Sequence, residues 1–363
     1  MTRNAVLFAM LLIALADDVR AAMSLDDIRL PPGFSIGVYA EVPNARSLSL
    51  GGNGVVFVSN RGADSVYAIF PGGSNHNRVV EIADDLDMPN GIAYHDGDLY
   101  VAEKSQVRVY RDIDNKLDDP PEAELLDIDL PSERHHGWRY IGFGPDDKLY
   151  ISIGAPCNTC ERDGFGRIDR MNPDGSERET WATGIRNSLG FAFHPVTGEL
   201  WFTDNGRDML GDDMPPDELN NAAVQGLHFG FPYCHGGDIL DPEFGAGKDC
   251  GEYAAPARKL GPHVAPLGVR FYTGTMFPEE YHGQVFVAEH GSWNRSKKIG
   301  YRISLVRLVD GEAASYEAFA DGWLQGQARL GRPVDVLVLD DGSMLVSDDM
   351  NGLVYRISYE GEQ

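Results

Sequence analysis

Basic residues are scarce in this sequence. It has 31 Lys and Arg residues against 56 Asp and Glu residues, which gives a formal net charge of -25 over 363 residues. Nucleic acids and anionic membrane surfaces repel a chain of this charge at long range. We therefore expect no nucleic-acid partner, and we expect ligands that are neutral or whose charge is neutralised locally.

Long apolar runs are scarce as well. The N-terminal stretch from Ala5 to Ala16 follows the basic Arg3 and is too short to span a bilayer comfortably. We interpret residues 1–22 as a cleaved signal peptide, and an N-terminal membrane anchor is the alternative. The mature protein is then periplasmic or secreted and not an integral membrane protein. Candidate cleavage sites follow Ala16, Ala21 and Ala22.

Cysteine is rare, with four residues, all after the expected signal peptide. Four thiols allow three pairings, and the local one joins Cys157 to Cys160 and Cys234 to Cys250, which closes two surface loops. Glu161 stands where haem c attachment needs a histidine, and the second pair lacks the close spacing of a zinc site. In an oxidising compartment we expect two structural disulfides, and a redox-active Cys-x-x-Cys is the alternative.

Helical periodicity is weak along the chain, apart from a possible short helical turn near residues 216–223. A different sequence pattern recurs: a short apolar strand, a turn with Gly or Asp-Gly, and a second strand similar to Leu-Tyr-Val. One such hairpin cannot bury both of its faces alone, so repeats at roughly 40 to 60 residues indicate a radial array of small sheets. We predict an all-β, six-bladed β-propeller that forms a single domain over residues 23–363. The six copies begin at Arg46, Met88, Arg139, Arg186, Val264 and Arg332.

Two further segments have a place in this architecture. The strand-like segment that begins at Leu30 is expected to pair with the last copy, which ends near Tyr359, and so to close the ring. A long Gly- and Pro-rich excursion runs from about Arg207 to His263 and contains the second cysteine pair. Loops of this length in a compact domain are usually functional or pinned, and we expect both here.

The ends of the hairpins locate the expected site. In an antiparallel hairpin, the residue that begins the first strand and the residue that follows the second strand lie at the same open end. With the inner strand first, all six open ends share one face around the axis. The first strands begin at Arg46, Asn90, His136, Arg186 with Asn187, Pro266 and Arg332. The second strands end at Asn60 with Arg61, Glu103 with Lys104, Gly154 with Ala155, Asp204 to Arg207, Glu289 with His290, and Asp348 with Asp349.

This face combines arginines with oxygen donors. Arginines bind carboxylate or phosphate groups in a bidentate manner, and carbonyls and carboxylates suit a hard cation such as calcium. The alternative is structural: Arg186 and Arg332 pair with carboxylates of neighbouring blades.

Two consecutive histidines precede the third inner strand. On an extended strand, consecutive side chains point to opposite faces, so only one of them faces the axis. We assign His136 to the axis, where a neutral imidazole is a suitable base near pH 7, and His135 to a packing position beside it. A histidine with a purely structural role is the alternative.

Five motifs follow one another along the chain: RHHGWRYIGFGPDDKLYISIG, TGIRNSLGFAFHP, LWFTDNGRD, EHGSWNRS and GRPVDVLVLDDGSMLVSDD. Together they resemble the soluble quinoprotein sugar dehydrogenases, most closely the L-sorbosone dehydrogenase-like and aldose sugar dehydrogenase branches. The resemblance covers nearly the whole mature chain and implies pyrroloquinoline quinone (PQQ) bound over the axis, with Ca2+ bridging cofactor and protein.

The resemblance implies a role for each matching residue. His136 aligns with the general base that removes the proton of a sugar hydroxyl while a hydride passes to the quinone. The cofactor contacts are Arg186, Asn187, Asn205 and Arg332, the calcium ligands are the carbonyls of Gly206 and Arg207, and the substrate side holds Asn90 and His135.

Some positions depart from the family pattern. Asn90 and Ala155 stand where sugar-oxidising relatives carry a glutamine and an aspartate. A cofactor lysine has no clear counterpart; Arg295 is the favoured replacement, with Lys297 and His290 as alternatives. A group of acidic residues is either a second calcium site or a solvated loop. Its members lack EF-hand spacing and are Asp208, Asp212, Asp213, Asp217 and Glu218.

The expected function is therefore a PQQ- and calcium-dependent oxidation of an aldose or related sugar aldehyde, with electrons passed to a soluble acceptor. Two alternatives stay open. One is a calcium-dependent lactonase that holds a metal-activated water with Asp204 and Asp348. The other is a non-catalytic propeller that binds a peptide or glycan.

Overall fold

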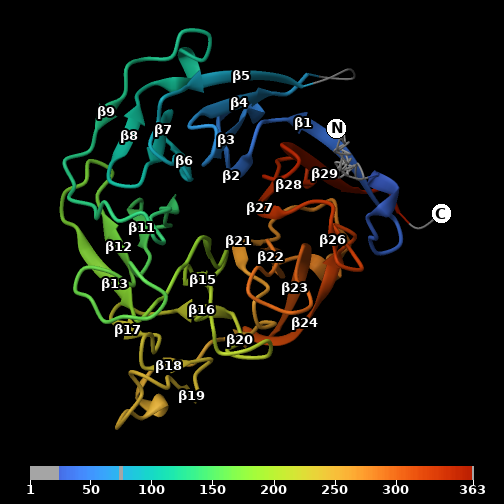
Figure 1. Ribbon diagram of the computed structural model, residues 1–363. Helices are drawn as coiled ribbons and strands as arrows, with labels where there is room; N and C mark the ends of the chain where they lie inside the picture. Colours follow the sequence, from blue (N-terminus) through green and yellow to red (C-terminus); the bar gives the residue numbers. More distant parts are fainter. Residues whose placement is uncertain (1–23, 73–76, 362–363) are drawn as a thin grey trace, which may run out of the picture.

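The computed structural model describes residues 24–72 and 77–361. Their regular secondary structure is almost only β-strand, arranged as six sheets of four or five strands around a central axis (Figure 1). This arrangement confirms the predicted all-β, six-bladed propeller. The expected signal peptide and its cleavage sites lie outside the described residues. Within the described ranges, no helix is long and apolar enough to cross a membrane.

Each of the first three blades starts with its innermost strand, and the outermost strand of blade 3 comes from a later part of the chain. Blade 1 contains β2 (Ala45–Leu50), β3 (Val56–Asn60), β4 (Val66–Phe70) and β5 (Arg78–Ala83). Blade 2 contains β6 (Gly91–His95), β7 (Asp98–Ala102), β8 (Val107–Tyr110) and β9 (Glu124–Leu125). Blade 3 contains β10 (Ile141–Phe143), β11 (Leu149–Ile153), β12 (Arg167–Met171), β13 (Glu179–Thr183) and β17 (Leu227–His228).

The last three blades include two strands that are distant in sequence. Blade 4 contains β14 (Phe191–Phe193), β15 (Leu200–Asp204), β16 (Glu218–Ala222) and β20 (Arg258–Lys259). Blade 5 contains β21 (Pro266–Phe271), β22 (Val285–Glu289), β23 (Arg302–Val309) and β24 (Glu312–Ala320). Blade 6 contains β27 (Pro333–Val338), β28 (Met344–Asp348), β29 (Leu353–Tyr359) and the N-terminal β1 (Phe34–Glu41).

The remaining elements are short. Two small hairpins are formed by β18 (Cys234–His235) with β19 (Ile239–Leu240) and by β25 (Leu324–Gln325) with β26 (Ala328–Arg329). Single 3-10 turns are η1 (Leu25–Asp27), η2 (Gly52–Gly54), η3 (Ile113–Asn115), η4 (Cys250–Glu252) and η5 (Glu279–Tyr281).

The hydrophobic core is divided among the blade interfaces. Each of six apolar clusters combines side chains from two neighbouring blades, as where Phe57 and Val66 of blade 1 pack with Leu99 and Tyr110 of blade 2. Second strands such as β11, β15, β22 and β28 are buried along their whole length because a blade covers each of their faces. The ring therefore depends on every blade contacting both neighbours.

The helical turn expected near residues 216–223 is a strand instead. β16 pairs with β15 from Ala222 opposite Leu200 to Glu218 opposite Asp204. Asp217, at the start of this segment, does not cap a helix, since it accepts hydrogen bonds from the backbone N–H groups of Gly206 and Ala265. Sheet pairing and these buried hydrogen bonds override the local helical signal.

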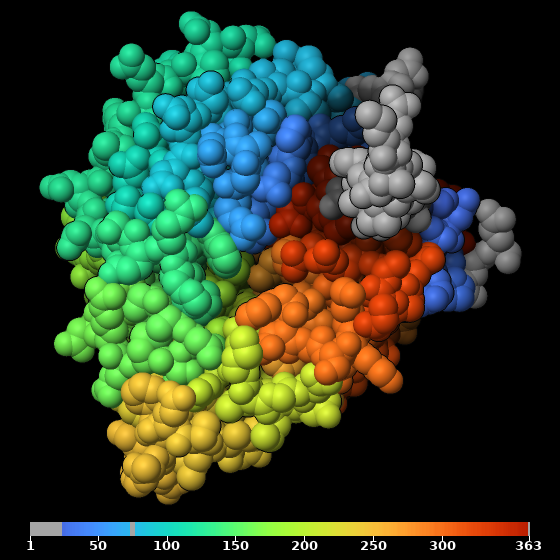
Figure 2. All heavy atoms as spheres, in the orientation of Figure 1, coloured from blue at the N-terminus to red at the C-terminus, as the bar shows by residue number. Residues whose placement is uncertain are grey.

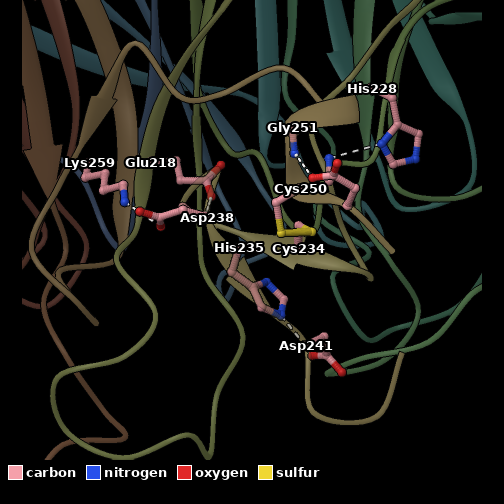
Figure 3. The surroundings of a disulfide bond; sticks show 12 residues. Glu218, His228, Cys234, His235, Asp238, Asp241, Cys250, Gly251 and Lys259 are labelled. Atoms are coloured by element: carbon pink, nitrogen blue, oxygen red, sulfur yellow. Dashed lines mark hydrogen bonds and ion pairs between the residues drawn. A yellow bond between two sulfur atoms is a disulfide. The ribbon is translucent and has the colours of Figure 1, made fainter. Parts of the chain in front are cut away.

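The excursion between β15 and β21 is pinned, as expected. The Cys234–Cys250 disulfide is formed, and His235 Nε2 lies 2.8 Å from a carboxylate oxygen of Asp241 (Figure 3). Asp241 also pairs with Arg207, so the excursion is tied back to the end of β15. The part that carries β18 and β19 projects from the rim of the ring (Figures 1 and 2).

The N-terminal strand closes the ring. β1 pairs antiparallel with β29, from Phe34 opposite Tyr359 to Glu41 opposite Leu353. The Phe34 ring lies within 5.3 Å, centroid to centroid, of four aromatic rings from blades 5 and 6 or the turn beside them: Phe277, Tyr281, Phe319 and Tyr359. The ring is thus closed by two interactions: backbone pairing of β1 with β29 and an aromatic cluster between the last two blades.

We predict that Phe34→Ala lowers the free energy of unfolding by about 3 kcal/mol, because it leaves a cavity among four rings at the closure. Val38→Ala on the same strand, where the side chain is 49% exposed, is the matched control and should change it by less than about 0.5 kcal/mol. Urea unfolding of both variants measures the difference. Equal effects would contradict this account of closure.

Candidate active site

A cavity of about 570 Å³ opens where the inner hairpins end around the axis. The sequence predicted side chains from all six blades on this face; five blades contribute them at the ends of their first two strands, and blade 2 does not. The cavity is lined by Arg46, Arg61, Arg134, His135, His136, Trp138, Arg186, Asn187, Leu189, Asn205, Gly206, Asp208, Asp217, His263, Ala265, Leu267, His290, Gly291, Trp293 and Arg332.

The lining is strongly cationic for so acidic a chain. It includes five arginines and two aspartates, in a protein whose formal net charge is -25. Charge of one sign in a concave, weakly solvated site concentrates the field and attracts the opposite sign. The cavity therefore favours an anionic ligand.

Two of the arginines, Arg186 and Arg46, pair with carboxylates, whereas Arg332, which the structural alternative also names, does not pair with a described carboxylate. Arg186 is buried, and its guanidinium donates to Asn158 O, Asn205 O and an Asp208 carboxylate oxygen at 2.9–3.0 Å. Arg46 donates to Asn90 Oδ1 at 2.8 Å and to Asp349 at 2.7 Å. These bonds fix both guanidinium groups in position.

The other arginines differ. Arg332 donates its side-chain bonds to the carbonyls of His290 and Gly291, and neither Arg61 nor Arg332 forms an ion pair with a described carboxylate. Arg61 lies over the Trp138 ring, 4.5 Å from its centroid. Burial, with Arg46 as the next cause, lowers the pKa of Arg61 to about 10. Cations held close together in this way are stabilised when an anion binds.

The backbones that carry these arginines are held by buried carboxylates. Asp204 accepts from the backbone N–H groups of Arg186 and Asn187 at 2.8 and 2.6 Å, and Asp348 accepts from Arg332 N at 2.9 Å. Neither aspartate lines the cavity. The carboxylates that the lactonase alternative uses to hold water thus hold the protein backbone.

His136 occupies the cavity wall in a defined tautomer. Its Nδ1 lies 2.8 Å from Ala155 O, and a carbonyl only accepts, so Nδ1 carries the proton. Nε2 receives no hydrogen bond from the described residues and is the ring nitrogen free to accept a proton. Burial lowers the pKa of His136 to about 2, with Arg186 as the next cause.

The geometry assumed for the two histidines needs correction. His135 and His136 lie in a turn closed by Gly137 N donating to Arg134 O, and His136 has a φ of 49°. The alternation of an extended strand does not apply there. Both rings therefore line the cavity, with centroids 4.1 Å apart.

The loop after β15 lies beside Arg186. Asn205 Nδ2 donates to the carbonyls of Asn187 and Pro266, and Gly206 N donates to Asp217 at 2.7 Å. The side chain of Arg207 turns away to Asp241 and Glu243, so only its backbone remains available as a ligand here.

One side-chain oxygen near this loop is available to a cation or to a hydrogen-bond donor of a ligand. Asn187 Oδ1 is buried without a hydrogen-bond partner among the described residues. A buried carbonyl oxygen left unpaired costs free energy, so its position fits a group bound in the cavity. This oxygen therefore fits a cation or a hydrogen-bond donor of a bound ligand beside the arginines.

Several predicted residues lie outside the cavity lining. Asn90 is buried beneath Arg46, where its Nδ2 donates to Arg139 O at 2.9 Å. Arg295 is engaged by Asp212 O, Lys297 O and Asp213. Among the three candidates for the position of the cofactor lysine, His290 lines the cavity, whereas Arg295 and Lys297 do not.

His290 is held by a carboxylate. Its Nε2 lies 3.0 Å from Asp349, which also pairs with Arg46. Burial lowers the pKa of His290 to about 4, because the opposing effect of Asp349 is smaller. His290 is therefore neutral near pH 7.

The acidic residues considered for a second calcium ion do not converge. In the described part of the chain, no group of three or more His, Cys, Asp or Glu side chains is placed to hold a metal ion. Asp208 pairs with Arg186, Asp213 pairs with Arg295, and Asp217 accepts backbone N–H groups.

Sequence reasoning missed several residues of the lining. They include Arg134, Trp138, Leu189, His263, Leu267 and Trp293. Trp138 and Arg134 lie within two residues of His136, and Trp293 lies in the GSWNR motif. Their positions in the sequence close to predicted site residues could have identified these three. Trp138 Nε1 is a second buried group without a partner among the described residues.

Fold and site together define a propeller with a cationic ligand site on its axis. The model of the glucose/sorbosone dehydrogenase family matches residues 102–292, more than half of the chain, so the chain belongs to this family. This agrees with the resemblance noted in the sequence motifs.

Related sequences are similar over different lengths. An uncharacterized protein of Borreliella burgdorferi is 33% identical over 352 residues, which cover 92% of this chain and 91% of that protein. A pyrroloquinoline quinone-dependent pyranose dehydrogenase of Coprinopsis cinerea is 27% identical over 215 residues, 48% of this chain and 28% of that one.

Solved structures share the fold. The PQQ domain of the Coprinopsis cinerea pyranose dehydrogenase superposes with a TM-score of 0.78 at 18% identity, covering 91% of this chain and 97% of that one. A calcium structure of a Trichoderma reesei enzyme of family AA12 gives 0.81 at 18% identity, covering 92% and 97%. The PQQ-bound aldose sugar dehydrogenase of Streptomyces coelicolor gives 0.64 at 19% identity, covering 91% and 99%.

We predict that His136 stays neutral, with the proton on Nδ1, from pH 8 down to pH 5, because its pKa is lowered and not raised. Long-range 1H–15N NMR of the imidazole nitrogens measures this directly. A titration midpoint near 6.5, the ordinary value for histidine, would contradict the burial and hydrogen bonding described.

Proposed function

We propose that this protein is a PQQ- and calcium-dependent dehydrogenase that oxidises an aldose or a related sugar aldehyde in the periplasm or outside the cell. The observation that carries the proposal is the axial cavity, where five arginines meet a buried histidine with a free Nε2. PQQ is a planar tricarboxylate, and such a ligand needs cations around it. Two disulfides suit an oxidising compartment.

The arginines would bind the cofactor. Arg332 and Arg61 offer guanidinium groups that no described carboxylate neutralises, while Arg186 and Asn187 present a fixed cation and an unpaired oxygen. The carbonyls of Gly206 and Arg207 and Asn187 Oδ1 are the oxygens proposed to hold calcium. Once bound, PQQ and calcium supply a quinone carbon that accepts hydride and a Lewis acid that polarises it.

His136 would act as the general base. Its Nδ1–H bond to Ala155 O fixes the ring, so Nε2 is the atom that accepts the proton of a sugar hydroxyl. Arg186 helps to lower the pKa of His136, so an anionic group bound against Arg186 offsets this contribution and makes Nε2 a stronger base. Fixed guanidinium groups would also stabilise the negative charge that a bound quinone gains with the hydride. Electrons then pass to a soluble acceptor.

We predict that the purified protein, mixed with PQQ, Ca2+ and an aldose, reduces the cofactor, and that His136→Gln slows this at least about 100-fold. His95→Gln is the matched control, because His95 lies at the far end of an inner hairpin, against Phe143. Cofactor absorbance in stopped flow measures the rate, and thermal melting checks folding. Retained activity in His136→Gln would remove His136 as the base, and lactone hydrolysis without cofactor reduction would favour the lactonase.

We also predict that Arg61→Leu raises the dissociation constant of PQQ about tenfold, because an unpaired cation is lost from the cavity. Arg78→Leu is a matched control, since Arg78 also lies over an aromatic ring, Phe70, but on the outer strand of the same blade. Fluorescence titration with PQQ compares the two variants. Equal affinities would show that Arg61 does not contact the ligand.

A further inference from the structure

The segment from Ala155 to Cys160 contacts the cavity residues of two blades. It follows β11 and is closed on itself by the Cys157–Cys160 disulfide. Ala155 O accepts from His136 Nδ1, and Ala155 N donates to Arg186 O, both at 2.8 Å. The base and the nearest arginine are thus both fixed from this one segment.

Asn158, inside the disulfide loop, makes the most specific of these contacts. Its backbone carbonyl accepts from Arg186 Nε, and its Oδ1 accepts from Arg186 Nη2 and from Asp208 N, all at 2.9 Å. Its Nδ2 donates to Asp208 O at 3.1 Å. Asp208 in turn pairs with Arg186 at 2.9 Å. Asn158, Arg186 and Asp208 therefore form a closed network.

This network joins the disulfide loop of blade 3 to the two segments at the open end of the β14–β15 hairpin in blade 4. The disulfide loop belongs to blade 3, Arg186 precedes the inner strand of blade 4, and Asp208 lies just beyond Gly206 and Arg207 in the loop after β15. Cys157 and Cys160 enclose only two residues, so the crosslink restricts the backbone that carries Asn158 very closely. An amide side chain held in this way donates and accepts without adding charge.

We propose that the Cys157–Cys160 loop is the positioning element of the axial site and that Asn158 is its positioning residue. Asn158 sets the orientation of the Arg186 guanidinium and the distance of the 205–208 loop from it. The disulfide keeps Asn158 in place. The proposal rests on the proposed function only for the identity of the ligand.

The first test compares three substitutions inside one loop. Asn158→Ala removes the two acceptor bonds and the donor bond of the side chain, and Asn158→Asp keeps both acceptor bonds. Thr159→Ala is the matched control, because Thr159 Oγ1 has no hydrogen-bond partner among the described residues. Hydrogen exchange of the Asp208 amide, whose acceptor is Asn158 Oδ1, is the direct readout.

We expect Asn158→Ala to speed exchange of the Asp208 amide at least about tenfold and to raise the dissociation constant of PQQ in calcium by about tenfold. Asn158→Asp should restore most of the amide protection, and Thr159→Ala should match the parent protein in both. The Asn187 amide, held by Asp204, should exchange equally slowly in all of them.

Unchanged Asp208 exchange in Asn158→Ala would overturn the proposal. So would faster exchange with unchanged PQQ affinity, since Asn158 would then stabilise the loop without positioning the site. If the parent protein binds no PQQ, the proposed function fails, and exchange at the Asp208 amide alone decides whether Asn158 positions this loop.

The second test removes the crosslink. Cys157→Ser with Cys160→Ser should speed exchange at the Ala155 and Asp208 amides and weaken PQQ binding about as much as Asn158→Ala does. Cys234→Ser with Cys250→Ser is the matched control, because that disulfide lies in the excursion and should leave both amides and the affinity unchanged (Figure 3). Equal effects of the two pairs would overturn a specific role for the first.

Discussion

The hydrogen bonds that hold guanidinium groups at the propeller axis are the interaction on which the rest of the site depends. Arginine is costly to bury unless each of its donors has a partner. Here Arg186 is satisfied by two carbonyls and a carboxylate, and Arg46 is satisfied by Asn90 and Asp349. Asp204 and Asp348 fix the backbones of Arg186 and Arg332 from behind. Cations are thus held in place before a ligand arrives, as electrostatic preorganisation requires.

The ring of blades makes this precision possible. Each blade packs on both neighbours, and β1 closes the ring onto blade 6, so the ends of the inner hairpins are fixed relative to one another. The strands and turns play equivalent parts from blade to blade, whereas the residues at the open ends differ. A cationic site at the axis of a strongly acidic chain then draws anions to one place on the molecule.

The sequence predicts the fold well because one physical signal is repeated in every blade. It predicts six blades, closure by the N-terminal strand and both disulfides, and it brings His136, Arg186, Asn187, Asn205, Gly206 and Arg332 to one cavity. It fails where the backbone leaves the strands. His135 and His136 lie in a turn, and Asn90 and Arg295 have closer partners than the cavity. Such partners come from distant segments, which spacing along the chain does not reveal.

The central claim is that the axial cavity binds PQQ with calcium, and calorimetric titration of the purified protein with PQQ tests it most directly. The account predicts one binding site per chain, with an affinity that falls sharply when calcium is removed by a chelator. Absence of saturable binding in the presence of calcium, or binding of equal strength with and without calcium, would contradict it.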